Sequence, residues 1–371
     1  MKFQLESLSN DERDIYITGN FNAWNPKDPR FILNRVNESL YEISISDRIL
    51  KESIEYKFTK GGWENVELDR YGNFTSNRKQ KKSKQPIKDV VEQWRLNWGP
   101  FKEKYFPKVE LISENFYIPQ LDRTRKVWIL LPYDYHTSSK LYPVLYLQDA
   151  QNLFNEDSKY GNWEIDKKLA LLSEYGRGDV IVVAVEHGVQ QRINEFIFDN
   201  NSVAKNSEGK KYIRFIADTL KHYIDANFRT LKEREHTGIG GSSLGALVSL
   251  YSGFLYPEVF SKLLIFSPSL WVEPGYNFPL FSFKVPFKTK VYLYGGELEG
   301  SDMVKRIRTF EKKMKNWESK NLFDFEFKTQ INPEGTHHEF FWSQEFPKAI
   351  EWLYYDQKEN PVDKSPELKS T

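Results

Sequence analysis

The segment His236-Thr-Gly-Ile-Gly-Gly-Ser-Ser-Leu-Gly-Ala246 decides the fold that this sequence predicts. It places Ser243 in a Gly-x-Ser-x-Gly frame, between an apolar β-prone stretch and a helix-compatible stretch. A serine at such a strand-to-helix turn has a strained backbone and an exposed hydroxyl. The amide of Leu244 then falls on the first helical turn, where negative charge is favoured. Chance produces the frame in about one chain in ten of this length, so the rest of the sequence has to support it.

Apolar segments alternate with helical patterns on both sides of this turn. Uniformly apolar runs of this kind are typical of buried parallel strands, and residues 212–224 and 303–317 each show one apolar helical face. The alternation predicts a doubly wound α/β-hydrolase sheet over residues 108–356. The candidate strands are 127–131, 144–147, 180–185, 237–240, 263–266 and 291–294.

The first 78 residues have a different pattern. Short aromatic and β-branched runs at 14–20, 40–45 and 54–59 alternate with turn signals, and no helical pattern intervenes. Residues 1–78 are therefore predicted to form a small all-β, immunoglobulin-like sandwich domain. The Lys-rich, Pro-broken residues 79–107 are predicted to be a linker, and the polar residues 357–371 a disordered tail.

Composition and charge exclude several classes of protein. The net charge of the 371 residues is +1 and the basic cluster at 79–84 is short, so no nucleic-acid partner is expected. No apolar run reaches the ~18–20 residues of a membrane span, and no signal peptide is recognised, so a cytoplasmic protein is expected. The absence of cysteine excludes disulfides, thiolate metal sites and a cysteine nucleophile. No metal-ligand spacing appears, and we expect no metal and no cofactor.

A serine nucleophile needs a base, and the base needs an acid that fixes its tautomer. Among the six histidines, His337 and His338 follow the last strand-like run and precede the final helix, as the chain order Ser, acid, His requires. The acid should follow an intervening strand, where Glu297 and Glu299 occur. The order of residues thus leaves two histidines and two glutamates as candidates.

Five segments between residues 142 and 342 resemble a known protein family. They are 142–154, 238–246, 266–269, 295–299 and 335–342. In this order they resemble the putative-esterase family of α/β-hydrolases, which includes enterochelin-esterase-like and feruloyl-esterase-like enzymes and the mycolyltransferases.

The resemblance implies one choice of base and one of acid. In relatives the base is the histidine five residues before a tryptophan, which selects His337 before Trp342. The acid comes three residues after a strand-end glycine, which selects Glu299 counted from Gly296, with Glu297 in reserve.

The resemblance also implies an oxyanion hole and substrate contacts. The hole would use the backbone N–H of Leu244 and a second N–H from Ala150 or Gln151, although relatives often have glycine at the Ala150 position. Arg192 and Glu195 match a loop that borders the site in relatives, with structural ion pairing as the alternative role. The candidate substrate-binding residues are Trp163, Arg192 and Trp271.

The segments 15–26 and 55–64 resemble starch- and glycogen-binding sandwich modules. Aromatic side chains bind sugar rings by apolar stacking, which makes Trp24 and Trp63 candidate carbohydrate-binding residues. The alternatives are a core role for Trp24 and a structural role for Trp63.

Together these features predict a serine carboxylic-ester hydrolase that works through a Ser243–His337–Glu299 triad and an acyl-enzyme. Its expected partner is a small-molecule ester, with a sugar-linked or siderophore-linked ester as candidates. One alternative is an acyltransferase with the same triad, and another is a non-catalytic carbohydrate-binding or interaction protein.

Overall fold

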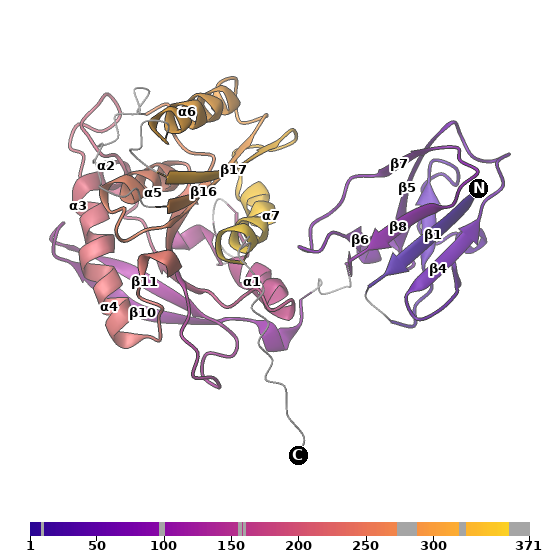
Figure 1. Cartoon of the computed structure of the whole chain (residues 1–371), viewed down its shortest axis with the longest axis horizontal. Coiled ribbons are helices and arrows are strands. Elements are labelled where there is room, and N and C mark those ends of the chain that lie inside the picture. Colours follow the sequence, from indigo (N-terminus) through magenta and orange to yellow (C-terminus); the bar gives the residue numbers. More distant parts are fainter. Residues whose placement is uncertain are drawn as a thin grey trace, which may run out of the picture. The chain divides into compact units, whose positions relative to one another are not determined.

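The computed structural model describes residues 1–8, 11–95, 101–154, 158, 161–272, 288–318 and 324–355. The chain divides into two compact units (Figure 1). The first comprises Met1–Phe106 with Lys167–Tyr175, and the second comprises Pro107–Asp166 with Gly176–Thr371. The predicted tail, residues 357–371, lies outside the described residues.

The first unit is a β-sandwich, as the sequence predicts. Its two larger sheets have the strand orders β3-β4-β1-β8 and β2-β5-β7, and β6 pairs with β9. Along β5 the buried side chains alternate with more exposed ones, so that Ile54, Tyr56 and Phe58 enter the core. The strands are β1 (Lys2–Ser7), β2 (Tyr16–Gly19), β3 (Asn34–Arg35), β4 (Leu40–Ser44), β5 (Ser53–Thr59), β6 (Glu67–Leu68), β7 (Arg78–Lys81), β8 (Ile87–Val91) and β9 (Gln93–Trp94).

Three of these strands lie in the range that the sequence predicts as a linker. β7 pairs with β5, β8 runs parallel to β1, and β9 pairs with β6. Trp94 is 1% exposed and its Nε1 donates to Ser7 Oγ at 3.0 Å. The strands therefore continue well past residue 78. The lysine-rich composition misled the prediction because exposed edge strands such as β7 also carry many charges.

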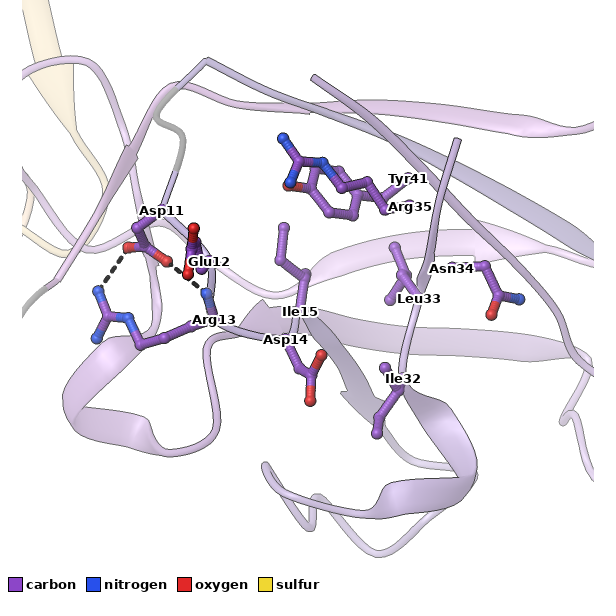
Figure 2. A pocket seen from close by; sticks show the side chains of 10 residues that line it. All are labelled: Asp11, Glu12, Arg13, Asp14, Ile15, Ile32, Leu33, Asn34, Arg35 and Tyr41. Atoms are coloured by element: carbon purple, nitrogen blue, oxygen red, sulfur yellow. Dashed lines mark hydrogen bonds and ion pairs between the residues drawn. The ribbon is translucent and has the colours of Figure 1, made fainter. Parts of the chain in front are cut away.

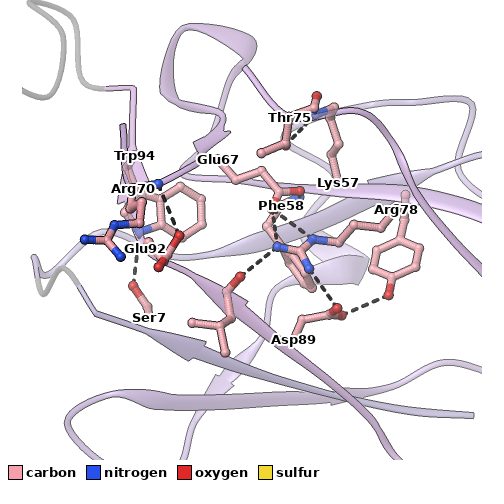
Figure 3. A network of polar contacts seen from close by, with 12 residues as sticks. Ser7, Lys57, Phe58, Glu67, Arg70, Thr75, Arg78, Asp89, Glu92 and Trp94 are labelled. Carbon is pink, nitrogen blue, oxygen red and sulfur yellow. Dashed lines mark hydrogen bonds and ion pairs between the residues drawn. The ribbon is translucent and has the colours of Figure 1, made fainter. Parts of the chain in front are cut away.

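A buried polar network joins four strands of this unit (Figure 3). The Arg78 guanidinium donates to Glu67 Oε2 at 2.7 and 2.9 Å and to Asp89 Oδ1 at 2.8 Å. Tyr56 OH donates to Asp89 Oδ2 at 2.9 Å. Glu67 is 1% exposed, and a carboxylate at that depth requires such a partner. Arg78 therefore holds β5, β6, β7 and β8 together as one folded unit.

The second unit contains an eight-stranded sheet of order β10-β11-β13-β12-β14-β15-β16-β17. All six predicted strands are present, and those from β12 to β17 are parallel to their sheet neighbours within that set. The run 127–131 was expected to be parallel, but β11 is antiparallel to both neighbours. Only the short turn at 119–122 joins β10 to β11, whereas a parallel pair needs a crossover of a dozen or more residues. The strands are β10 (Lys108–Ile118), β11 (Arg123–Leu131), β12 (Val144–Gln148), β13 (Ile181–Val185), β14 (Thr237–Ser242), β15 (Lys262–Phe266), β16 (Lys288–Gly296) and β17 (Asp324–Asn332).

Helices cover both faces of this sheet, which makes it doubly wound. On one face Gly253 of α5 lies against Leu263, and Ile307 of α6 lies against Gly295. On the other face, Tyr292 packs edge-on against Trp352, in the π-helical turn that follows α7. The helices of the described chain are α1 (Ile165–Glu174), most of which belongs to the first unit, α2 (Arg192–Phe196), α3 (Gly209–Arg214), α4 (Lys221–Asn227), α5 (Leu244–Leu255), α6 (Met303–Glu318) and α7 (Glu339–Ile350), with π-helical turns at Phe215–Leu220 and Glu351–Tyr355.

Candidate active site

The candidate nucleophile lies on the sharp turn between β14 and α5. Ser243 has φ 56° and ψ −121°, a backbone conformation that non-glycine residues rarely adopt. Two glycines permit the turn: a Cβ on Gly241 would lie 2.9 Å from the carbonyl carbon of Gly245, and a Cβ on Gly245 would lie 3.0 Å from Asp149 Oδ2. Strand and helix therefore approach closely, and Ser243 lines a surface pocket beside them.

The two predicted oxyanion donors come from neighbouring segments. Leu244 is the first residue of α5, and its amide N–H meets no acceptor among the described residues. The loop after β12 lies beside this turn, as the closeness of Asp149 to Gly245 shows. In this loop Asp149 is left-handed (φ 61°), while Ala150 has no positive φ. Alanine in place of the relatives' glycine is therefore accommodated without backbone strain.

Two polar contacts fix this loop in place. Arg192, at the start of α2, donates from Nε and Nη2 to the two carboxylate oxygens of Asp149, each at 2.8 Å. The Gln151 side chain donates to the His187 carbonyl at 3.0 Å and accepts from its N–H at 3.1 Å. The guanidinium of Arg192 is thus engaged by the loop that carries Ala150.

Glu195, which the sequence grouped with Arg192, has other partners. Its fully buried carboxylate accepts from Arg123 Nη1 at 2.9 Å and also pairs with Arg125. Both residues therefore form structural ion pairs, but with different residues.

A histidine and a carboxylate meet in the loops that follow β16 and β17. His337 Nδ1 is 2.7 Å from Glu299 Oε2, and the Glu299 side chain is fully buried while that of His337 is 41% exposed. Because a carboxylate accepts, the proton of a neutral His337 belongs on Nδ1, which leaves Nε2 as the basic atom.

The alternative acid and the alternative base have other surroundings. Glu297 is exposed, and its backbone N–H donates to the carbonyl of Asn332. His338 is the N-cap of α7, where its Nδ1 accepts from the Phe340 N–H at 3.1 Å.

One pocket of about 610 Å³ is lined by both Ser243 and His337. The Oγ of Ser243 makes its hydrogen bond with Ser269 Oγ at 3.1 Å, and none with His337. Ser269 is held in place because its N–H donates to the Ser243 carbonyl at 3.1 Å. The sequence motif 266–269 contained Ser269, but nothing in the sequence indicated this contact.

The pocket has an apolar part and a polar part. Trp271, 53% exposed, contributes a large aromatic surface, whereas Trp163 is 2% exposed and does not line the pocket. Trp163 instead stacks on Phe266, with ring centroids 5.3 Å apart. Because Trp163 is buried, it is not placed to contact a substrate. An aromatic residue close to a site motif in the sequence can belong to the core instead. The other lining residues include Leu244, Pro268, Met303, Ser301, Asp302 and Arg306.

A further carboxylate lies near His337 and Glu299, and the sequence motifs did not point to it. Glu339 is 7% exposed, and burial raises the pKa of its carboxyl group. Its Oε1 accepts from Asn152 Nδ2 at 3.2 Å.

Within the described ranges, no three side chains of His, Asp or Glu gather as a metal site would require. Nor does any helix in the described part of the chain have the length and apolar character to cross a membrane.

The first unit contains the two candidate sugar-binding tryptophans. Trp24 is half-buried and Trp63 is 42% exposed, with ring centroids 6.3 Å apart and planes inclined by 38°. A separate pocket of about 280 Å³ in this unit is lined by polar groups such as Asp11, Arg13 and Arg35 (Figure 2). It contains neither tryptophan, so the tryptophan pair is a distinct surface feature.

A serine on a strained strand-to-helix turn, followed in the chain by a buried acid and a histidine in strand-end loops, defines the α/β-hydrolase class. A comparison with family models matches residues 118–365 to the esterase family described as "Putative esterase". The chain belongs to this family, and the sequence-based resemblance is confirmed. Its general activity is therefore carboxylic-ester hydrolysis.

Known proteins resemble the chain in two separate ways. An uncharacterized protein, YbbA of Bacillus subtilis (strain 168), is 24% identical over 240 residues, which cover 62% of this chain and 92% of YbbA. An alpha-amylase of Niallia circulans is 36% identical over 64 residues, 17% of this chain and 5% of the amylase. The crystal structure of an enterochelin esterase from Shigella flexneri covers 95% of this chain and 92% of its own, with 13% identity and a TM-score of 0.52, which shows a shared fold.

Proposed function

We propose that this protein hydrolyses small carboxylic esters with Ser243 as nucleophile, His337 as general base and Glu299 as the acid that orients the base. The 2.7 Å contact between His337 Nδ1 and the buried Glu299 carboxylate is the observation that carries the proposal. A buried carboxylate stabilises the imidazolium that forms when the histidine takes a proton.

The proposed reaction has two halves. Ser243 Oγ attacks the ester carbonyl while His337 Nε2 takes its proton, and the carbonyl oxygen becomes an oxyanion. The N–H groups of Leu244 and the Ala150 region would bind this oxyanion, each contributing ~3 kcal/mol to transition-state stabilisation. His337 then protonates the departing alcohol, and a water activated by the same nitrogen releases the acid from Ser243.

The hydrogen bond between Ser243 and Ser269 fits a resting arrangement of the nucleophile. Rotation of the Ser243 side chain about its Cα–Cβ bond would exchange Ser269 for His337 as the hydrogen-bond partner. Such a change is expected when substrate binds, because catalytic hydrogen bonds in unliganded enzymes are often long or misdirected.

Covalent labelling tests the serine mechanism. Incubation with a fluorophosphonate, followed by peptide mass spectrometry, should place one phosphonyl group on Ser243, because attack at phosphorus follows the same course as attack at an ester carbonyl. Labelling should disappear in Ser243→Ala. A protein that hydrolyses esters while its Ser243 stays unlabelled would contradict the proposal.

The pocket wall and the acyl acceptor define the kind of reaction that this site would catalyse. The exposed Trp271 ring on the pocket wall favours an ester with an apolar or aromatic group. Sugar-linked and siderophore-linked esters are the candidate substrates. An acyltransferase would use the same acyl-enzyme but transfer the acyl group to an alcohol. Product analysis with added glycerol or sugar separates the two, because only a transferase makes the new ester in preference to the free acid.

A second candidate function belongs to the first unit, namely carbohydrate binding by Trp24 and Trp63. The rings of the half-buried Trp24 and the exposed Trp63 lie close enough for one sugar chain to contact both. The amylase similarity is compatible with this function.

Replacing Trp63 with alanine is expected to weaken binding to soluble starch about tenfold, because the sugar rings lose an apolar stacking surface. Affinity electrophoresis in starch-containing gels measures the effect. Phe74→Ala is the control, since Phe74 is an exposed aromatic residue of the same unit outside the pair. Equal migration of wild type and Trp63→Ala, with or without starch, would refute sugar binding at this surface.

A further inference from the structure

The buried acid of the proposed triad has a second carboxylate oxygen, which faces away from the histidine. Glu299 Oε1 accepts from the Gly296 N–H at 2.7 Å and from the Ser267 hydroxyl at 2.7 Å. Both contacts are on the oxygen that His337 does not use. Two hydrogen bonds therefore anchor Oε1 of the carboxylate, while Oε2 faces the imidazole.

The direction of the hydrogen bond from Ser267 is fixed by a tryptophan. Trp342 Nε1 lies 2.8 Å from Ser267 Oγ. An indole N–H can only donate, so Ser267 Oγ must accept from Trp342. The single hydroxyl proton of Ser267 is then left for Glu299 Oε1. The result is a one-way chain from Trp342 through Ser267 to Glu299.

The backbone of Ser267 is held in an unfavourable conformation. Its φ is +46°, in the left-handed region that residues other than glycine and asparagine rarely adopt. The following residue is Pro268, which disfavours helical backbone angles in the residue before it. The Ser267 N–H donates to the Tyr294 carbonyl at 2.8 Å and helps to retain this conformation. Strain of this kind persists where the surrounding structure requires it, often at functional sites.

Trp342 also contacts the base directly. Its ring meets the His337 ring edge-on, with centroids 5.0 Å apart and planes at 87°. Trp342 is 4% exposed, so its position is set by the core of the second unit. One buried side chain thus supports the imidazole with its ring and the carboxylate through its N–H.

We propose that Ser267 and Trp342 are positioning residues that hold the Glu299 carboxylate in place and aim its Oε2 at His337. The proposal rests on the proposed function, because Glu299 must first be the acid of the triad. The two donors on Oε1, the Gly296 N–H and the Ser267 hydroxyl, leave Oε2 free to face the imidazole.

Replacing Ser267 with glycine tests the proposal, because glycine tolerates the positive φ and removes the short side chain that carries the hydroxyl. The kcat for p-nitrophenyl butyrate is expected to fall about 10- to 100-fold, the loss of one hydrogen bond to a charged group. KM should stay nearly unchanged. Trp342→Phe keeps an aromatic ring, removes the donor and should lower kcat in the same direction. Ser252→Ala, which removes another buried serine hydroxyl far along α5, should leave kcat unchanged.

A double-mutant cycle separates positioning from a general structural effect. In a Glu299→Ala background, Ser267→Gly should lower kcat no further, because the group through which it acts is gone. An equal loss in both backgrounds, or full kcat in both Ser267→Gly and Trp342→Phe while Glu299→Ala is impaired, would overturn the positioning role and leave the triad intact. Full activity of Glu299→Ala would instead overturn the acid assignment in the proposed function.

Discussion

Ser243→Ala is expected to lower kcat for p-nitrophenyl acetate and butyrate by about 10⁴-fold or more, with the fold unchanged. The reason is that no other hydroxyl in the pocket occupies the strained turn beside the Leu244 amide. Alanine adopts the backbone of Ser243 about as readily as serine does, so the melting temperature should change little. Steady-state hydrolysis and thermal unfolding, measured on the same preparation, check both expectations.

Ser242→Ala provides the matched control for this experiment. Ser242 is the last residue of β14, adjacent to the nucleophile, and its hydroxyl makes no hydrogen bond among the described residues. Its replacement should leave kcat within a few-fold of wild type. Substantial residual activity in Ser243→Ala would mean that another group attacks the ester, with Ser269 as the first residue to examine because it contacts Ser243 Oγ.

The two adjacent histidines are expected to respond in opposite ways to replacement by alanine. His337→Ala should lower kcat by about 10⁴-fold, because Ser243 then has no base, while the melting temperature stays near that of wild type. His338→Ala should retain kcat, but its free energy of unfolding should fall by about 1 kcal/mol, because α7 loses its N-cap acceptor for the Phe340 N–H. Hydrolysis assays and thermal unfolding of both variants measure this crossed pattern.

Each histidine variant is the control for the other, since the two replacements are identical and one residue apart. Loss of activity in His338→Ala with activity retained in His337→Ala would reverse the assignment of the base. Loss in both would indicate that the loop has to keep its conformation for either histidine to act, and a melting temperature lowered in both would accompany that result.

Local sequence predicted the catalytic candidates because the chemistry depends on short motifs. The glycines around Ser243 were predictable, since the approach of β14 to α5 leaves no room for a Cβ. The strand pattern predicted the sheet, because uniformly apolar runs suit strands that are buried on both faces. The sequence failed at β7 and at β11, where a charged edge strand resembled a linker and an antiparallel strand resembled a parallel one.

Contacts between distant segments decided what the motifs could not. From the chain order, Glu297 and Glu299 were equally placed to serve as acid, and the family resemblance only ranked them. In the structure the backbone turn after β16 buries Glu299 against His337 and leaves Glu297 exposed. Trp163 shows the same limit, because an aromatic residue near a site motif can equally belong to the core.

The sequence by itself determined the class of fold, the strand-to-helix turn at Ser243 and the order of the serine, glutamate and histidine candidates, because periodicity and short motifs are local properties of the chain. Only the tertiary structure decided that Ser269 contacts Ser243, that Asp149 engages Arg192, and that Trp342 reaches Glu299 through Ser267. Hydrogen bonds between side chains depend on how strands and helices far apart in the chain pack together, and no local pattern encodes that packing.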